Sequence, residues 1–379
     1  MVADIFRSII KPKIKPLNCI TIKKKNILSN LKYLSSFQKE SSLFPVVKSN
    51  AYGHGLKEIC EILEETDIKK LCVDSYIEYQ FVEKYTTKDI LVLWETNHEN
   101  YKHFNFKRTA FCVSNLDTIN YLIWLGRSIK IHLFLNTGMN REGFQKKELK
   151  SALEILKGSK IEIEWVMSHF SSADDPNMKQ IKVQVKVFKD MYKQVEKTGL
   201  SVKYRHISNS AGTIKFQDEF FNACRPGIAL YGYNPLSKKD KSYKLWEKLK
   251  PALDVYTTVV SVQEVKKGEW VSYNLTHEIE KDTRLATIPF GYYEWLDRRL
   301  SNKLEVQYKK DTLALRGRVC MNLSTLEIGK KKIHRWDMIK LISSNPKDIN
   351  SVQSIANTLW TISYEVLTGL KESIHKETV

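Results

Sequence analysis

The segment LFPVVKSNAYGHG (43–55) decides the fold, because a short apolar run ends in Lys48 and is followed at once by polar residues and two glycines. Such a run is typical of a buried strand in a parallel sheet. A lysine at the carboxyl end of an inner barrel strand is costly to bury unless it is neutralised or covalently bonded. Schiff-base formation neutralises it, and a desolvated lysine is a nucleophilic amine. For this segment alone, a solvated lysine at a strand end is the alternative.

Similar β-rich runs recur from residue 43 to residue 232, and most are separated by segments with helical apolar spacing, as in 149–156 and 181–195. Eight strands alternating with helices over about 200 residues favour a (β/α)8 barrel. Periodicity alone leaves an open doubly wound sheet as the alternative. The eight runs are 43–48, 70–75, 90–94, 109–114, 129–136, 162–170, 204–210 and 223–232.

After about residue 250 the pattern changes to strands of period two, such as DVYTTVVSVQEV (254–265) and TLALRGRVCM (312–321). This pattern predicts a second, mainly β domain. We therefore predict a fold of α/β barrel plus all-β class. The barrel is expected over 22–250 and the β domain over 251–379, joined by an N-terminal strand within 1–21.

Composition limits the classes of function. The chain has 379 residues and a formal net charge of +18, but its lysines are spread along the whole sequence and no nucleic-acid-binding motif accompanies them. We expect no nucleic-acid partner. The first twenty residues lack an apolar signal region, and no later run is long enough to span a membrane. We expect a cytoplasmic protein without a membrane partner. The six cysteines lack zinc-site spacing, so we expect reduced core thiols and no metal.

VVKSNAYGHG (46–55) closely resembles the lysine motif of alanine racemases, which bind pyridoxal 5'-phosphate (PLP). The resemblance continues along nearly the whole chain, in the family's order and spacing. The other matching segments are TGMNREGF (137–144), MSHFSSAD (167–174), HISNSAGT (206–213), RPGIALYG (225–232), VSYNLTHE (271–278), IPFGYYEWLDRRLSN (288–302), GRVCMN (317–322) and TISYEVLT (361–368).

The resemblance implies that Lys48 holds PLP as a Schiff base and, once freed, serves as the base for the α-proton of the D-enantiomer. Hydroxyl and backbone N–H groups are suited to binding the phosphate dianion. The groups that match the family's phosphate site are Tyr52, Ser210, Tyr364 and the backbone amides near Gly227 and Ile228.

Arg225 matches the arginine that faces the pyridine nitrogen. Because arginine does not lose its proton in proteins, that nitrogen should stay unprotonated, which restrains transamination and suits racemisation. Fold-related decarboxylases present a carboxylate there. His169 matches the histidine beside this arginine, which hydrogen-bonds onward towards the second base. Arg141 matches the arginine that contacts the PLP phenolic oxygen and the substrate carboxylate.

The chain departs from the family at the second base, where His277 occupies the position of a tyrosine. Free histidine has a pKa of about 6.5 and tyrosine about 10, so histidine can accept a proton directly at neutral pH. We interpret His277 as the base for the L-enantiomer. A substrate-recognition role and an inert side chain are the alternatives, and Tyr273 is another donor if the loop shifts.

Two further departures lie near the substrate. Phe134 replaces a lysine that orients the arginine matched by Arg141, so we expect Asn136 or an anion to orient Arg141 instead. Asn322 replaces an aspartate at the substrate entrance. These changes raise the prospect of a substrate other than alanine.

In the family, the β domain of one subunit completes the site over the barrel of the other. The resemblance therefore implies a homodimer in which His277 and Met321 act on the partner's cofactor. The predicted activity is racemisation of an amino acid, by default L-alanine to D-alanine, a peptidoglycan precursor. The alternatives are a racemase for serine or a basic amino acid, a decarboxylase, a PLP-binding protein with lost or altered activity, and a nucleic-acid binder.

Overall fold

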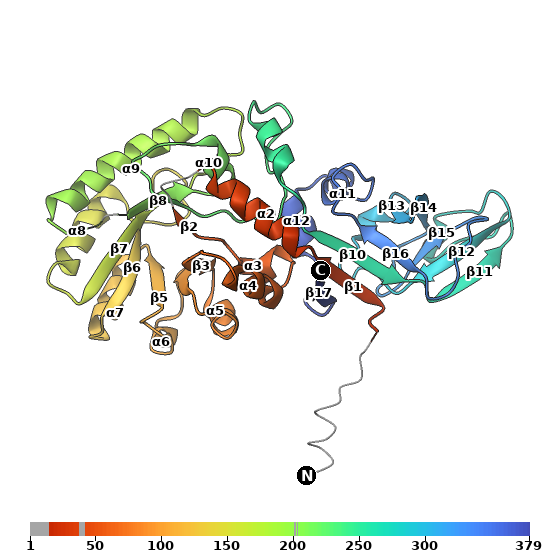
Figure 1. Cartoon of the computed structure of the whole chain (residues 1–379), viewed down its shortest axis with the longest axis horizontal. Helices are drawn as coiled ribbons and strands as arrows, with labels where there is room; N and C mark the ends of the chain where they lie inside the picture. Colours follow the sequence, from red (N-terminus) through yellow and green to blue (C-terminus); the bar gives the residue numbers. More distant parts are fainter. Residues whose placement is uncertain (1–14, 38–41, 201, 203) are drawn as a thin grey trace, which may run out of the picture.

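The protein consists of a barrel and a β domain, as the computed structural model in Figure 1 shows. The structure describes residues 15–37, 42–200, 202 and 204–379. The barrel forms one end of the molecule, and a nine-stranded sheet forms the other. The α/β barrel plus mainly β fold predicted from the sequence is confirmed.

The barrel is a closed sheet of eight parallel strands. Val46, just after the first barrel strand, pairs in parallel with Cys72 of the second. Val47 N donates to Cys72 O at 2.9 Å and Cys72 N donates to Pro45 O at 2.8 Å, which closes the ring. The spatial order is β2 (Ser42–Leu43), β9 (Ala223–Cys224), β8 (Tyr204–Ser208), β7 (Ile161–Met167), β6 (Ile129–Phe134), β5 (Thr109–Val113), β4 (Asp89–Val92) and β3 (Lys70–Val73).

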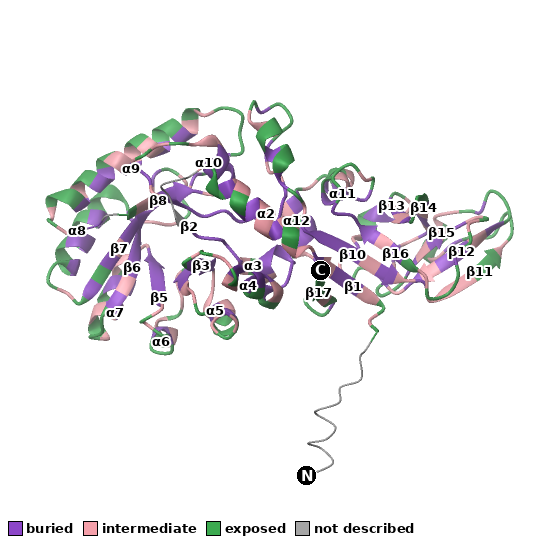
Figure 2. Ribbon diagram, in the orientation of Figure 1, coloured by how far each residue is buried: buried purple, intermediate pink, exposed green. Residues whose placement is uncertain are grey.

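Amphipathic helices surround the barrel, and Figure 2 shows the buried residues concentrated along its strands and on the inward faces of these helices. The longest helix, α9, buries Ile181, Phe188 and Val195 at helical spacing, as the sequence predicts. The barrel helices are α2 (Lys24–Ser35), α4 (Leu56–Glu64), α5 (Tyr76–Val82), α6 (His98–Tyr101), α7 (Leu116–Trp124), α8 (Lys146–Leu156), α9 (Lys179–Lys197) and α10 (Ser210–Lys215).

All eight predicted barrel runs overlap a strand, but the runs 43–48 and 223–232 overlap strands of only two residues, β2 and β9. The run 223–232 was predicted as one strand, whereas β9 ends at Cys224. Pro226 has no N–H to continue the ladder, and hydrogen bonds from Leu230, Tyr231 and Gly232 to residues three positions earlier form turns. This early end of β9 leaves Arg225 and Gly227 at the mouth of the barrel.

The β domain is a single nine-stranded sheet into which the N-terminal strand is inserted. β1 pairs antiparallel with β10 and parallel with β17. The order is β11 (Ser261–Val265), β12 (Thr283–Ile288), β15 (Ser324–Glu327), β14 (Asp311–Arg316), β13 (Glu305–Tyr308), β16 (Met338–Ile342), β10 (Leu253–Thr258), β1 (Asn18–Ile22) and β17 (His375–Thr378).

Of the N-terminal segment 1–21, residues 1–14 lie outside the described part, and the domain bounds 22–250 and 251–379 stay predictions. The predicted strand through 312–321 is wrong beyond Arg316, because Gly317 leaves the extended conformation with φ +75°. Two helices, α11 (Val352–Leu359) and α12 (Ser363–Thr368), precede the last strand, β17.

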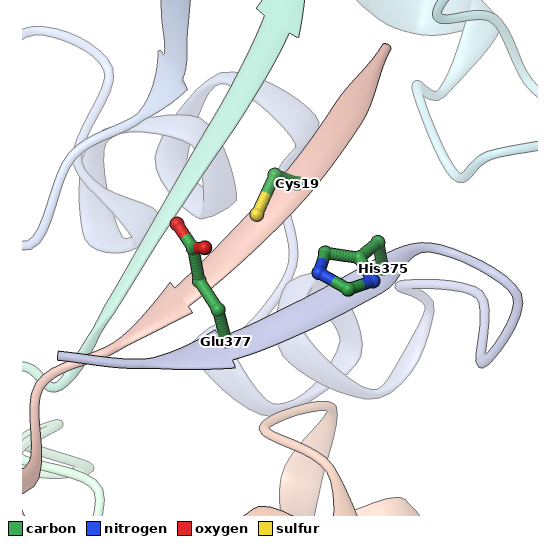
Figure 3. Close-up of side chains that lie close together, drawn as sticks. All are labelled: Cys19, His375 and Glu377. Atoms are coloured by element: carbon green, nitrogen blue, oxygen red, sulfur yellow. The ribbon is translucent and has the colours of Figure 1, made fainter. Parts of the chain in front are cut away.

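The pairing of β1 with β17 brings Cys19, His375 and Glu377 together on one face of the sheet (Figure 3). Burial and the carboxylate of Glu377 raise the pKa of the Cys19 thiol to about 11. All six cysteines are free, and all except Cys320 are buried, in agreement with the expected reduced core thiols. Within the described ranges, no helix is long and apolar enough to cross a membrane.

The two domains meet where α12 packs against the short turn α3 (Lys48–Tyr52), which carries the key lysine. Gly53 ends this turn with φ +79°, and a Cβ at this position would lie 2.1 Å from the carbonyl oxygen of Leu367 in α12. A side chain at position 53 therefore cannot be added without separating the two segments.

We predict that Gly53→Ala lowers the free energy of unfolding by about 3 kcal/mol or more, since a left-handed backbone penalty is added to a backbone overlap. Gly158→Ala is the matched control, because Gly158 has φ +81° with nothing within 4 Å of its would-be Cβ. The control should lose about 1 kcal/mol. Equal losses in urea denaturation would show that the contact with Leu367 is unimportant.

Candidate active site

A cavity of about 300 Å³ opens at the carboxyl ends of the barrel strands. This is the end at which barrel enzymes place their catalytic groups. Most of the residues predicted from the sequence line it, and they come from loops after different strands and from α12. The predicted residues in its wall are Lys48, Tyr52, Arg141, His169, Ser210, Arg225, Gly227 and Tyr364.

Lys48 begins a strained turn. Ser49, Asn50, Ala51 and Tyr52 have φ between 51° and 54°, the left-handed region that non-glycine residues rarely occupy. Tertiary contacts hold this conformation: Ser49 N donates to the Glu78 carboxyl at 2.5 Å, and Leu56 N donates to Asn50 Oδ1 at 3.0 Å. Strain held in this way is typical of functional segments.

The amine of Lys48 faces a carboxylate and an aromatic ring. Nζ lies 3.9 Å from Asp74 Oδ2 and 4.5 Å from the centre of the Trp94 ring. Asp74 N donates to Glu78 Oε2 at 3.1 Å. Burial and a side-chain hydrogen bond with Asp74 raise the pKa of the Glu78 carboxyl to about 7. The lysine is half-buried and can be reached from the cavity.

The side of the cavity nearest α10 is built from hydroxyls and amides. Ser210 Oγ accepts hydrogen bonds from Gly227 N at 2.9 Å and from Ala229 N at 3.2 Å. A Cβ at position 227 would lie 2.3 Å from Tyr52 Oη, so only glycine fits there. The Tyr364 ring lies 6.0 Å from that of Tyr52, and burial raises the pKa of both phenols. These neutral donors suit a phosphate group.

Ile228 lies next to this group but outside the cavity wall. Its side chain is fully buried, and its carbonyl accepts from Tyr231 N and Tyr233 N. Only its backbone amide is therefore relevant to the predicted phosphate site.

Arg225 is a buried cation held by neutral acceptors. It is 3% exposed. Its Nη1 donates to Nδ1 of His206, and its Nη2 donates to Ser168 O at 2.7 Å and to His169 Nδ1 at 3.2 Å. Burial, followed by the charge of Arg225, holds the pKa of His169 well below its usual value. His169 is therefore neutral, with its proton on Nε2.

Arg141 is oriented by Glu142. Arg141 Nε and Nη2 donate to Glu142 Oε1 at 3.1 Å and 2.8 Å. Of the two expected partners, Asn136 is wrong, because its Oδ1 accepts from Gly138 N at 3.1 Å and from Asn140 N at 3.2 Å instead. The other expected partner, an anion, is found here as the Glu142 carboxylate. Phe134 is buried against Cys112 and Met167 in the cavity wall. Its apolar ring cannot orient Arg141 as a lysine at this position would.

His277 and Met321 lie in the β domain, outside the cavity wall of their own chain. His277 follows a 3-10 turn (Tyr273–Leu275) and lies in a loop. Burial and then Arg316 lower the pKa of His277. Asn322 Nδ2 donates to Glu294 Oε1 at 3.1 Å. The carboxylate of Glu294 therefore lies next to Asn322, the residue that replaces the aspartate of the family.

Sequence reasoning missed several polar groups around the cavity: Asp74, Glu78, Glu142 and two barrel histidines, His132 and His206. The histidines had a detectable signal, because each interrupts an apolar inner strand, in 129–136 and 204–210. Their side chains are fully buried. A polar residue at such a position must find a partner inside the barrel.

Comparison with known proteins gives one consistent result. The model of the alanine racemase N-terminal domain matches residues 22–235, and that of the C-terminal domain matches residues 252–378. The chain is 30% identical over 351 residues to the alanine racemase of Carboxydothermus hydrogenoformans, covering 91% of this chain and 95% of the relative.

Solved structures agree. Alanine racemase from Clostridium difficile 630 superposes with a TM-score of 0.89 at 26% identity, covering 97% of both chains. The fold is also shared, with a TM-score of 0.84 at 24% identity over 96% of this chain and all of the other, by an alanine racemase from Bartonella henselae with covalently bound pyridoxal phosphate.

The buried histidines predict an acid-sensitive fold. Burial is the largest cause that lowers the pKa of His54, His132, His169 and His206, in His54 to about 4. Each has a folded-state pKa below its unfolded value, so the stability it contributes is present above about pH 6.5 and is lost as the pH falls. Each costs about 1.4 kcal/mol per pH unit below that point. Glu78 acts in the opposite direction. Because the pKa of its carboxyl is raised in the folded protein, proton uptake by this one group stabilises the fold as the pH falls.

The free energy of unfolding of the cofactor-free protein should therefore fall steeply between about pH 6.5 and pH 5. Urea denaturation across this range measures it. A free energy that stays level or rises would contradict the assignment of neutral buried histidines.

Proposed function

This chain belongs to the alanine racemase family of PLP-dependent isomerases, and from that premise we propose that it interconverts L-alanine and D-alanine. The observation that carries the proposal is the cavity itself. It gathers an amine on a strained turn, a cluster of phosphate-binding donors and a buried arginine held by neutral partners.

The donor set fits PLP. Lys48 would hold the cofactor covalently, Arg225 would face its ring nitrogen, and Arg141 would bind the substrate carboxylate. When bound, PLP supplies an electron-withdrawing ring that acidifies the α C–H of an attached amino acid. The phosphate would be held by Tyr52, Ser210, Tyr364 and the amides of Gly227 and Ile228.

Arg225 favours racemisation over other reactions. A guanidinium remains a donor at every accessible pH, so Arg225 would donate to a ring nitrogen facing it and keep that nitrogen unprotonated. Arg225 would thereby limit how far negative charge spreads into the ring and would favour return of the proton to the α-carbon. A decarboxylase-like site would need a carboxylate in place of Arg225.

The mechanism is completed by two bases on opposite faces of the bound amino acid. Lys48 Nζ would take the α-proton of the D-enantiomer, and His277 of the partner subunit would take that of the L-enantiomer. The lowered pKa of His277 keeps its ring neutral and able to accept a proton at neutral pH. His169, with its proton on Nε2, is able to donate onward from the Arg225 side.

A homodimer is part of this proposal. His277 lies among exposed apolar side chains on the β domain, a surface of the kind that marks a protein interface. In such a dimer this face would cover the partner's cavity, and Met321 would help to close it. The exposed residues are Tyr273, Leu275, Tyr293, Met321 and Leu323.

A racemase for another amino acid is the second candidate, and Glu142 is the observation that favours it. Its carboxylate lines the cavity and is shared with Arg141. This carboxylate could pair with a basic side chain of the substrate or accept a hydrogen bond from a serine hydroxyl. Serine and basic amino acids therefore belong in the substrate test.

We predict that His277→Ala slows α-proton exchange in deuterated water from L-alanine by about 100-fold or more while D-alanine keeps most of its exchange. Tyr273→Phe is the matched control, and it should leave both rates near wild type. Equal loss for both enantiomers would reject the two-face assignment. Absence of exchange with every amino acid tested would reject the racemase function.

Mixed dimers of Lys48→Ala and His277→Ala test the shared site. Random mixing gives hybrid dimers with one site that has both bases, so activity should recover to about one quarter of wild type. Without recovery, the placement of His277 over the partner's cavity is wrong.

A further inference from the structure

We propose that Lys70, Glu164, His132 and His206 are positioning residues that fix the direction of a hydrogen-bond chain through the barrel and thereby hold Arg225 as a donor at the cavity. Together with Arg225 they form the barrel relay. The role in catalysis rests on the proposed function, whereas the direction of the chain is a property of the protein without cofactor.

The barrel relay runs from the cavity to the opposite end of the barrel. Arg225 Nη1 donates to His206 Nδ1. His206 Nε2 and His132 Nδ1 are 2.9 Å apart, and His132 Nε2 is 2.9 Å from Glu164 Oε2. Lys70, the first residue of β3, donates from Nζ to the same Glu164 oxygen. Strands β3, β6, β7 and β8 each contribute one residue.

The two ends of the barrel relay determine where its protons lie. Arginine can only donate, so His206 Nδ1 must accept, and its proton is on Nε2. His206 therefore donates to His132 Nδ1, which places the His132 proton on Nε2. That N–H donates to the Glu164 carboxylate, which can only accept. All these bonds are satisfied when both histidines are neutral Nε2–H tautomers.

The surroundings keep the two histidines away from water and neutral. Both histidines are fully buried. The Trp165 ring lies 5.8 Å from that of His132, and the Phe44 ring lies 5.7 Å from that of His206. Burial is the largest cause of the lowered pKa of each histidine, and the positive charges of Lys70 and Arg225 add to it.

Lys70 preserves the direction that Arg225 and Glu164 set. It neutralises Glu164, and its side chain is 6% exposed. Without Lys70, the unpaired carboxylate of Glu164, which is only partly exposed, would stabilise a proton taken up from solvent by His132. A doubly protonated His132 donates from Nδ1 as well, so His206 must accept at Nε2 and carry its own proton on Nδ1. That N–H would point at the Arg225 N–H, and two donors repel each other.

The test compares Lys70→Met with the double variant Lys70→Met/Glu164→Gln. Removing both charges restores a neutral acceptor for His132 Nε2–H, so the double variant should regain the wild-type direction. If these residues had only a structural role, the double variant should be more impaired than Lys70→Met, because it loses more contacts. Lys215→Met is the matched control, since Lys215 is a buried lysine paired with Asp240 at 2.5 Å outside the relay.

The direct readout is nitrogen-15 NMR of the histidine rings in the cofactor-free protein. We expect Nε2–H tautomers for His132 and His206 in wild type, the Lys215→Met control and the double variant, and a protonated His132 in Lys70→Met. Nδ1–H tautomers in wild type, or an unchanged spectrum in Lys70→Met, would overturn the proposal.

With PLP bound, Lys70→Met should also lower α-proton exchange by about 10- to 100-fold, the usual loss when a group that orients a functional residue is removed. The double variant should recover most of this loss. If wild type exchanges no α-proton, the proposed function fails, while the NMR result still decides whether the relay exists.

Discussion

A guanidinium that cannot lose its proton is enclosed in the barrel at Arg225, and the arrangement of the cavity follows from satisfying it. Within the described residues, no carboxylate lies within ion-pair distance of this arginine. The Ser168 carbonyl, His169 and His206 accept its hydrogen bonds instead, and the ends of β7 and β8 supply them. Because the acceptors are neutral, the positive charge remains available to a ligand. A cofactor that presents a neutral ring nitrogen and an anionic phosphate suits this environment.

The same fold explains how two domains build one cavity. Closure of the barrel between Val46 and Cys72 places Lys48 at its mouth. The left-handed turn after Lys48 is held by Glu78 on one side and by α12 on the other, where Gly53 allows the close approach of Leu367. α12 precedes β17, the last strand of the β domain, and carries Tyr364 to the cavity. The C-terminal part of the protein therefore contributes to the site in its own chain, and the proposed dimer adds His277 from the partner.

The sequence was sufficient for the barrel because alternating strands and helices leave distinct periodicities, and for the lysine, arginine and phosphate groups because they lie in contiguous motifs. It was insufficient where partners are distant in the chain. The choice of Glu142 over Asn136 for Arg141 depends on a loop conformation that periodicity does not encode. The barrel relay joins four strands, and its members are separated by at least nineteen residues from one partner to the next. Local patterns predict elements, whereas such pairings emerge only from closure of the barrel.

The proposed chemistry depends first on Lys48 as the residue that carries the cofactor. Borohydride reduction of the PLP-loaded protein makes the lysine–cofactor bond permanent, and peptide mass spectrometry then locates it. We expect a single reduced adduct on Lys48, and we expect Lys48→Ala to prevent it. An adduct on another lysine, or no adduct in a protein that has bound PLP, would contradict it.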